Sequence, residues 1–433
     1  MHAREEIVDG FVKKYTPWGV VFCASLLFLQ QVILCINRTK QEEDNTNHNQ
    51  TKFFETMMNL DFHTYREICQ QPAMWLKAYD LVLSRKAEIK AFVDRYIAQG
   101  YDIVLTGAGT SAYIGDALQV ALYNTSFAGC RSIATTDIIT SAEMYFNKES
   151  KVLLVSFARS GNSPESVGTI NLVNKTAGEV AHIFITCNEQ GELAKMAAAS
   201  PENTLLMLLP KETNDLSLAM TSSYSTMLLT CSMIANIDNL EAHADYLRTM
   251  AENTAKAIEK YEGAIKEIAS RPFKRAVFLG TGELQGIAEE SRLKLQELTD
   301  GSVMCAFDSF LGFRHGPKAV IDKDTLLVYL LSEEPSVQRY EYDLIRQIRA
   351  NNEIVGYVAV SQTEPKIEGE YFDLNVVIGA PTSEHRYYSC VSYVVSAQLL
   401  GMFKSIDMGL SPDAPSVSGN ISRVVEGVII YED

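Results

Sequence analysis

The chain has 433 residues, of which 47% are hydrophobic and 21% charged, and its formal net charge at pH 7 is −16. This length exceeds one ordinary core and suffices for two domains and a tail. The acidic balance, without a dense Lys/Arg patch, argues against a nucleic-acid partner, so any anionic ligand must be held by local donors.

Residues 1–50 form an atypical extension that contains an uncharged apolar segment at 18–36. The segment is long enough to span a bilayer, although Gln30 and Gln31 interrupt it. Three interpretations stay open: a membrane anchor, an extra packed helix, and dispensable sequence upstream of the Met57–Met58 pair. We expect any membrane contact to run through residues 18–36 alone.

Residues 51–97 are expected to be mainly helical, because apolar residues recur at spacings of three and four from about Thr64. Pro72 should divide this region into two helices, and Gly100 should end it. From residue 98 onward, short apolar runs alternate with glycine turns and amphipathic stretches, as in "YDIVLTGAGTSAYIGDALQVAL". This alternation predicts a parallel sheet with helical crossovers.

The same pattern begins again in the second half, where "VFLGTGEL" at 277 resembles "VLTGAGTS" at 104 in pattern and composition. We predict two tandem α/β domains, at 98–254 and 255–406, joined by helix near residue 255. Each should be a parallel sheet flanked by helices, a flavodoxin-like three-layer sandwich. An irregular tail follows at 407–433.

The cysteines offer no metal or redox site. No two form a CxxC pair, and no His/Cys cluster has metal-ligand spacing. We expect buried, reduced thiols in a cytoplasmic protein without a metal ion. The eight are Cys23, Cys35, Cys69, Cys130, Cys187, Cys231, Cys305 and Cys390.

The glycine turns do not fit a dinucleotide fingerprint, because Ala112 and Gln285 occupy the third glycine position. They fit phosphate binding better, since a helix start offers free N–H groups and hydroxyl side chains add donors. One alternative is that Ser163 is simply an N-cap. The candidate phosphate-binding residues are Thr110, Ser111, Arg159, Ser160, Asn162 and Ser163.

These turns resemble those of the sugar isomerase (SIS) domain family, in which two such domains lie in tandem and bind phosphosugars. "GTS" at 109–111 and "SGNS" at 160–163 match the family's sugar-phosphate positions. From about residue 64 to the C-terminus, "EICQQPAMW", "GTGELQGIAEESRLKLQELTDG", "DSFLGFRHGPKAVI" and "NISRVVEGVIIY" are similar to the tagatose-6-phosphate ketose/aldose isomerase type, a galactosamine-6-phosphate deaminase/isomerase.

Glu290, Lys294 and Glu297 lie at spacings of four and three and therefore share one helix face. By themselves they could form a solvated ion-pair stripe. The resemblance extends to isomerase domains of glucosamine-6-phosphate synthase. It implies that Glu297 moves a proton between C1 and C2, with Lys294 and Glu290 as supporting charges.

The resemblance also implies that His315, in "FRHGPK", assists ring opening, often in the site of a neighbouring subunit. Arg423 stands where the synthase branch has a lysine. Because arginine stays charged and forms no Schiff base, we expect it to close the tail over the sugar electrostatically.

The expected reaction is galactosamine-6-phosphate and water to tagatose-6-phosphate and ammonia, catalysed without a cofactor by a homodimer or larger homo-oligomer. Ammonia release is expected because residue 2 is His2, where a synthase's glutaminase domain has a nucleophilic cysteine. Two alternatives are a fructosamine-phosphate deglycase and a plain aldose–ketose isomerase. A third is a non-catalytic sugar-phosphate sensor.

Overall fold

The computed structural model describes residues 61–380, 384–425 and 427–431. The apolar segment at 18–36, with its three interpretations, lies outside the described residues. In the described part of the chain, no helix is both long and apolar enough to cross a membrane.

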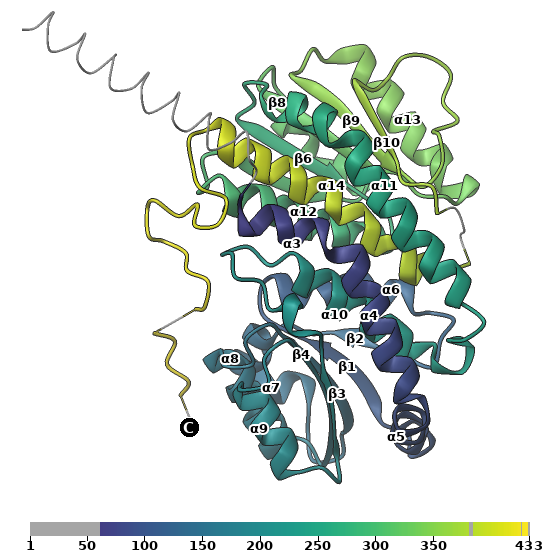
Figure 1. The fold of residues 1–433 in the computed structure, drawn as a ribbon, viewed down its shortest axis with the longest axis vertical. Coiled ribbons are helices and arrows are strands. Elements are labelled where there is room, and N and C mark those ends of the chain that lie inside the picture. Colours follow the sequence, from purple (N-terminus) through teal and green to yellow (C-terminus); the bar gives the residue numbers. More distant parts are fainter. Residues whose placement is uncertain (1–60, 381–383, 426, 432–433) are drawn as a thin grey trace, which may run out of the picture. The chain divides into compact units, whose positions relative to one another are not determined.

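The described chain begins with three consecutive helices (Figure 1). Pro72 lies in the first turn of the second helix, where its missing N–H and fixed φ are tolerated, and the predicted break falls just before it. A second break at Arg85, not predicted, separates the second helix from the third. The three are α3 (His63–Cys69), α4 (Gln71–Ser84) and α5 (Lys86–Ala98).

The first sheet has five parallel strands in the order β2-β1-β3-β4-β5. Its strands are β1 (Asp102–Thr106), β2 (Arg131–Ser132), β3 (Lys151–Ala158), β4 (Glu179–Thr186) and β5 (Thr204–Leu208). The helices of this domain are α6 (Thr110–Ala121), α7 (Thr135–Tyr145), α8 (Pro164–Thr176), α9 (Glu192–Ala199) and α10 (Ser222–Ala235).

The second sheet has the order β10-β9-β8-β6-β7. Numbered from its own first strand, this is the same 2-1-3-4-5 order as in the first sheet, the flavodoxin-like arrangement. The prediction of two tandem α/β units of one kind is therefore confirmed. The strands are β6 (Arg275–Leu279), β7 (Met304–Asp308), β8 (Thr325–Leu330), β9 (Gly356–Ser361) and β10 (Leu374–Val377), and the helices are α12 (Glu283–Leu298), α13 (Pro335–Asn351) and α14 (Arg386–Asp407).

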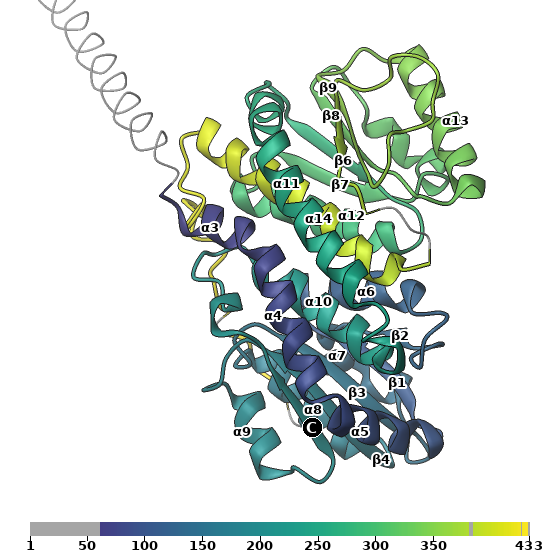
Figure 2. The same cartoon turned by 45° about the vertical axis from the view of Figure 1, so that its right-hand side comes forward.

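Helix joins the two units, as expected near residue 255, because α11 (Ala244–Ala269) runs continuously through that position. Helices α6, α12 and α14 lie between the two sheets (Figure 1 and Figure 2). Helix α12 packs against both α6 and α14, so a helix of the second unit directly faces the first helix of the first unit.

A glycine allows the close contact between α12 and α6. A Cβ built on Gly286 would lie 2.4 Å from the backbone nitrogen of Ala117, which no side chain can tolerate. Because the two backbones approach this closely, polar side chains near the start of α6 and along α12 can reach one another.

Candidate functional site

The site is built at the carboxyl edge of the first sheet. Strands β1 and β3 are parallel neighbours, and helices α6 and α8 begin at Thr110 and Pro164 after these strands end. In this strand order the chain changes direction between β1 and β3, and such a switch point opens a crevice at the carboxyl ends of the strands. Gly109 precedes α6 with φ 54°, a conformation that favours glycine.

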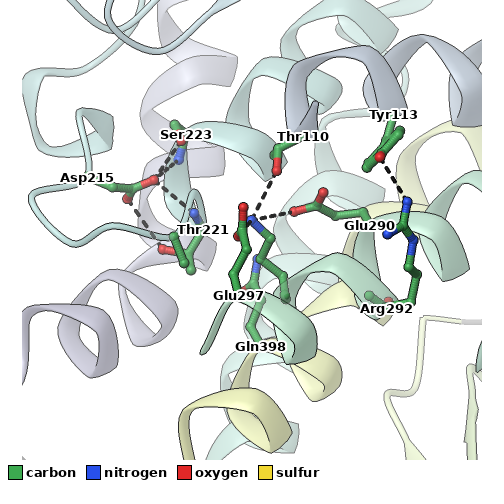
Figure 3. A network of polar contacts seen from close by, with 12 residues as sticks. Thr110, Tyr113, Asp215, Thr221, Ser223, Glu290, Arg292, Glu297 and Gln398 are labelled. Carbon is green, nitrogen blue, oxygen red and sulfur yellow. Dashed lines mark hydrogen bonds and ion pairs between the residues drawn. The ribbon is translucent and has the colours of Figure 1, made fainter. Parts of the chain in front are cut away.

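The three charged residues predicted on one helix face do share it and are in contact (Figure 3). The Lys294 ammonium lies 2.7 Å from Glu297 Oε2 and 3.3 Å from Glu290 Oε1. The side chains of Glu290 and Lys294 are completely buried, whereas that of Glu297 is 22% exposed. The solvated-stripe interpretation is therefore wrong for these residues.

The Lys294 ammonium also donates a hydrogen bond to Thr110 Oγ1 at 3.0 Å. Thr110 is the first residue of α6, one of the predicted phosphate-binding helices. The charged face of α12 is thus joined directly to the crevice of the first domain.

Burial sets the charge state of this cluster. It raises the pKa of Glu290 to about 8, against the opposing effect of Lys294, and neither Glu290 oxygen accepts a well-formed hydrogen bond. Burial alone would lower the pKa of Lys294, but Glu290 and Glu297 together raise it. Lys294 is therefore a cation at neutral pH.

The serine-rich loop after β3 makes contacts of its own. Ser163 is the N-cap of α8, and its Oγ accepts a hydrogen bond from the Ser166 backbone N–H at 3.3 Å, so the N-cap interpretation is confirmed. The Asn162 side-chain oxygen accepts from the backbone N–H of Glu192 at 2.9 Å, at the start of α9. The Ser160 hydroxyl accepts from the Asn162 backbone N–H. Phosphate binding by this loop stays a prediction.

Ser111 follows Thr110 in the first turn of α6 and is only 5% exposed. Its backbone N–H donates to the Ala108 carbonyl at 3.1 Å, within the glycine turn. Both predicted residues therefore lie in the first turn of α6, at the carboxyl edge of the first sheet. Thr110 is already bonded to Lys294, so Ser111 is the stronger phosphate candidate of the two.

Arg159 lies at the start of the serine-rich loop and is 7% exposed. Its guanidinium donates hydrogen bonds to the backbone carbonyls of Ser217, Leu218 and Arg423. Burial lowers the pKa of Arg159, and the nearby carboxylate of Asp215 opposes that shift. Arg159 holds backbone together in this structure, a role that the sequence did not reveal.

Arg423 brings the C-terminal tail to the same place. Its Nε donates to the backbone carbonyl of Asp215 at 2.9 Å, and its Nη2 donates to Asn214 Oδ1 at 3.0 Å. The tail is also bound to the end of α12, because Ser418 donates to the Asp300 carboxylate through its backbone N–H and its hydroxyl. The tail therefore runs from the helix of Glu297 to the first domain.

Sequence reasoning missed the buried carboxylate of Asp215, whose contacts with Thr221 and Ser223 are drawn in Figure 3. It accepts hydrogen bonds from the backbone N–H groups of Thr221, Ser222 and Ser223. Burial raises its pKa, and the bonds from Ser223 and Thr221 oppose that shift. Asp215 fixes the loop whose carbonyls receive Arg159 and Arg423; no local spacing in the sequence indicates this.

His315 lies apart from these contacts. It ends the short 3₁₀ helix Gly312–His315 after β7, its side chain is exposed, and it makes no hydrogen bond or ion pair with the residues that the structure describes. Within one chain, the structure does not bring His315 together with the cluster on α12.

The equivalent helix starts of the second domain carry carboxyl groups in place of hydroxyl groups. Gly282 precedes α12 with φ 66°, as Gly109 precedes α6, but the next residue is Glu283 in place of Thr110. The N-cap of α13 is Glu334, where the N-cap of α8 is Ser163. A carboxylate at a helix start repels phosphate, so these two positions suit an anion less well than Thr110 and Ser163 do.

No group of three or more His, Cys, Asp or Glu side chains that could hold a metal ion occurs in the described residues. The six cysteines in that part of the chain are all free thiols, but the expectation of buried thiols is wrong for Cys69 and Cys305, which are only partly buried.

Comparisons with known proteins agree with this geometry. The model of the SIS domain family matches residues 96–237. D-galactosamine-6-phosphate deaminase AgaS of Escherichia coli is 36% identical over 375 residues, which cover 85% of this chain and 95% of that protein. The AgaS deaminase of Shewanella sp. is also 36% identical, over 86% of this chain and 92% of its own.

Among solved structures, tagatose-6-phosphate ketose/aldose isomerase from Escherichia coli superposes with a TM-score of 0.77 at 33% identity, covering 86% of this chain and 97% of that one. The C-terminal domain of glucosamine-fructose-6-phosphate aminotransferase from Francisella tularensis has a TM-score of 0.67 at 17% identity, over 81% and 97% of the chains, and shows a shared fold.

Proposed function

Since this chain belongs to the AgaS family of SIS-domain proteins, we propose that it isomerises and deaminates galactosamine-6-phosphate, giving tagatose-6-phosphate and ammonia. The observation that carries this proposal is the partly exposed carboxylate of Glu297, held by Lys294 beside the first turn of α6. The charged form of a carboxylate is the form that acts as a general base, and the buried Lys294 ammonium lies 2.7 Å from this one.

The chemistry needs one base. After ring opening, Glu297 removes the C2 proton of the amino aldose, which the neighbouring aldehyde acidifies. Return of the proton to C1, with transfer of one amine proton to O1, leaves a hydroxymethyl group at C1 and an imine at C2. Water hydrolyses the imine to a ketose and ammonia. We propose that the phosphate is held by Ser111, by Ser160 and by the N-termini of α6 and α8, which offer donors without a global positive field.

Two further elements complete the proposal. His315 is exposed, so it would assist ring opening from a neighbouring copy of the chain, which makes a homodimer the smallest complete unit. Arg423 would close the tail over the sugar from the position in which it binds the Asp215 carbonyl. We place the reaction in the cytoplasm because the described cysteines are free thiols.

The test is ammonia release from galactosamine-6-phosphate, compared with glucosamine-6-phosphate, galactose-6-phosphate and tagatose-6-phosphate. Glu297→Gln should abolish turnover, by at least about 100-fold, while sugar-phosphate binding persists. Glu289→Gln is the matched control, because Glu289 lies on the same helix but faces Arg292 at 3.8 Å. Interconversion of the two non-amino sugars without ammonia release would favour a plain isomerase. Binding without any turnover in the unmutated protein would favour a sensor.

A further inference from the structure

We infer that Thr110 is a positioning residue for the base. Its hydroxyl accepts a hydrogen bond from the Lys294 ammonium, which also bonds Glu297, and thereby fixes Glu297 relative to the start of α6. The inference rests on the proposed function and assigns Thr110 a role different from phosphate binding.

The contacts of the Lys294 ammonium support this assignment. A lysine ammonium has three N–H bonds and no acceptor. Three acceptors surround Lys294 Nζ: Glu297 Oε2 at 2.7 Å, Thr110 Oγ1 at 3.0 Å and Glu290 Oε1 at 3.3 Å. Two of these contacts, to Glu297 and Thr110, are hydrogen bonds, the contact with Glu290 is an ion pair, and the Lys294 side chain is completely buried. Lys294 therefore holds Glu297 on one side and Thr110 on the other.

The Thr110 contact differs from the other two, because Glu290 and Glu297 lie on the same helix as Lys294. Thr110 is 184 residues away in sequence and starts α6 of the first domain. This hydrogen bond therefore joins the helix that carries the base to the helix whose N-terminus faces the crevice (Figure 3). Shortening or lengthening that link moves the carboxylate relative to the sugar, and misplacement by about 1 Å costs roughly 100-fold in rate.

Loss of the hydroxyl should also change the charges of the cluster. Thr110 is the only neutral group of the three around Lys294. Removing its hydroxyl leaves a buried ammonium with one hydrogen bond fewer, which costs free energy. A valine at this position keeps the shape of threonine and removes the acceptor. The ionisation of the Glu290–Lys294–Glu297 cluster should therefore move in Thr110→Val and remain in place in Thr110→Ser.

The experiment compares Thr110→Val, Thr110→Ser and Thr254→Val. Thr254 is an equally buried threonine whose hydroxyl bonds only the Met250 carbonyl of its own helix, at 2.8 Å. We expect Thr110→Val to lower kcat about 10- to 100-fold with KM changed less than about 3-fold, and to shift the pH profile of kcat. Thr110→Ser should recover kcat to within about 3-fold, and Thr254→Val should leave both constants unchanged.

A phosphate-binding role would instead raise KM at least about 10-fold at constant kcat, and this result would overturn the inference. Failure of Thr110→Ser to recover kcat would overturn it too. A titration of ¹³C-labelled glutamate carboxyls in the same variants gives a readout independent of turnover. If the unmutated protein releases no ammonia, the proposed function fails. The titration then still tests Thr110: a shift in Thr110→Val but not in Thr110→Ser supports its role as a positioning residue. No shift in Thr110→Val refutes that role.

Discussion

The guanidinium of Arg159 donates a hydrogen bond to the backbone carbonyl of Arg423, 264 residues further along the chain. The same guanidinium holds the carbonyls of Ser217 and Leu218, and Arg423 in turn holds the carbonyl of Asp215. One buried cation thus connects the serine-rich loop, the loop around Asp215 and the C-terminal tail. The tail is therefore attached through backbone carbonyls, which a change of side chain at the same positions does not remove.

Arg159→Lys should loosen the tail, because an ammonium on a shorter side chain cannot reach all three carbonyls. We expect a loss of about 1–3 kcal/mol in the free energy of unfolding for the buried carbonyls left unpaired. Amide hydrogens of residues 418–425 should exchange faster, as measured by mass spectrometry. Arg95→Lys is the control, since Arg95 is exposed and makes one long bond of 3.5 Å to the Glu202 carbonyl. Unchanged exchange in the tail of Arg159→Lys would contradict this role.

Gly168→Ala should release the end of the tail from α8. An added Cβ would lie 2.9 Å from Ile139 Cδ1 and 3.1 Å from Ile430 Cγ1, and Ile430 belongs to the irregular tail. Gly263→Ala in α11 is the matched control, because nothing lies within 4 Å of its added Cβ.

Relative to glycine, alanine in a helix interior stabilises by about 1 kcal/mol. We expect Gly263→Ala to gain this stability, seen as a higher melting temperature, and Gly168→Ala to gain none. The amide hydrogens of residues 427–431 should also exchange faster in Gly168→Ala. Equal stabilisation by the two alanines would show that Ile430 does not depend on the space beside Gly168.

Glu341→Gln should remove a pH dependence of stability. Burial raises the pKa of Glu341 to about 8, and its Oε2 accepts from the Ser332 backbone N–H at 3.1 Å. The pKa of Glu341 in the folded state lies above its unfolded value of about 4.3. The contribution of Glu341 to the free energy of unfolding is therefore fully present below pH 4.3 and is lost as the pH rises to about 8.

Between these two pKa values, Glu341 lowers the free energy of unfolding by up to about 1.4 kcal/mol for each unit by which the pH rises. In urea unfolding from pH 5 to 8.5, Glu341→Gln should gain stability over the unmutated protein at pH 8 and little at pH 5. Glu149→Gln, at an exposed position, should follow the unmutated curve. A gain that is equal at both pH values would mean that the carboxyl of Glu341 does not titrate in this range.

His182→Gln should act at the acid end. Burial lowers the pKa of His182 to about 4, and its Nε2 lies 3.0 Å from Asn174 Oδ1. The native state holds the neutral ring, so its stability contribution is full above pH 6.5 and is lost as pH falls from 6.5 toward 4.

His182 lowers the free energy of unfolding by up to about 1.4 kcal/mol for each unit by which the pH falls. Over the same range Glu341 raises the free energy of unfolding as the pH falls. Thermal unfolding between pH 4.5 and 7 should show a weaker loss at low pH in His182→Gln than in the unmutated protein. His63→Gln, at an exposed position, is the control. Parallel curves for the unmutated protein and His182→Gln would count against a neutral buried ring.

Much of the fold could be read locally. Strand, glycine turn and helix follow one another within about 30 residues, so the pattern reveals each unit and its repetition. The break before Pro72 and the N-cap at Ser163 are also local, because both depend on neighbouring backbone groups. Strand β2 escaped prediction because a strand of two residues carries no periodic pattern.

The sequence by itself determined the two α/β units, their shared design and the placement of Glu290, Lys294 and Glu297 on one helix face, because helix periodicity settles that arrangement. Only the tertiary structure decided what each side chain meets. Lys294 reaches Thr110 because Gly286 lets two helix backbones approach, and Arg159 binds a carbonyl of the tail. Hydrogen-bond partners 184 and 264 residues apart leave no trace in local spacing, since the fold of the intervening chain brings them together.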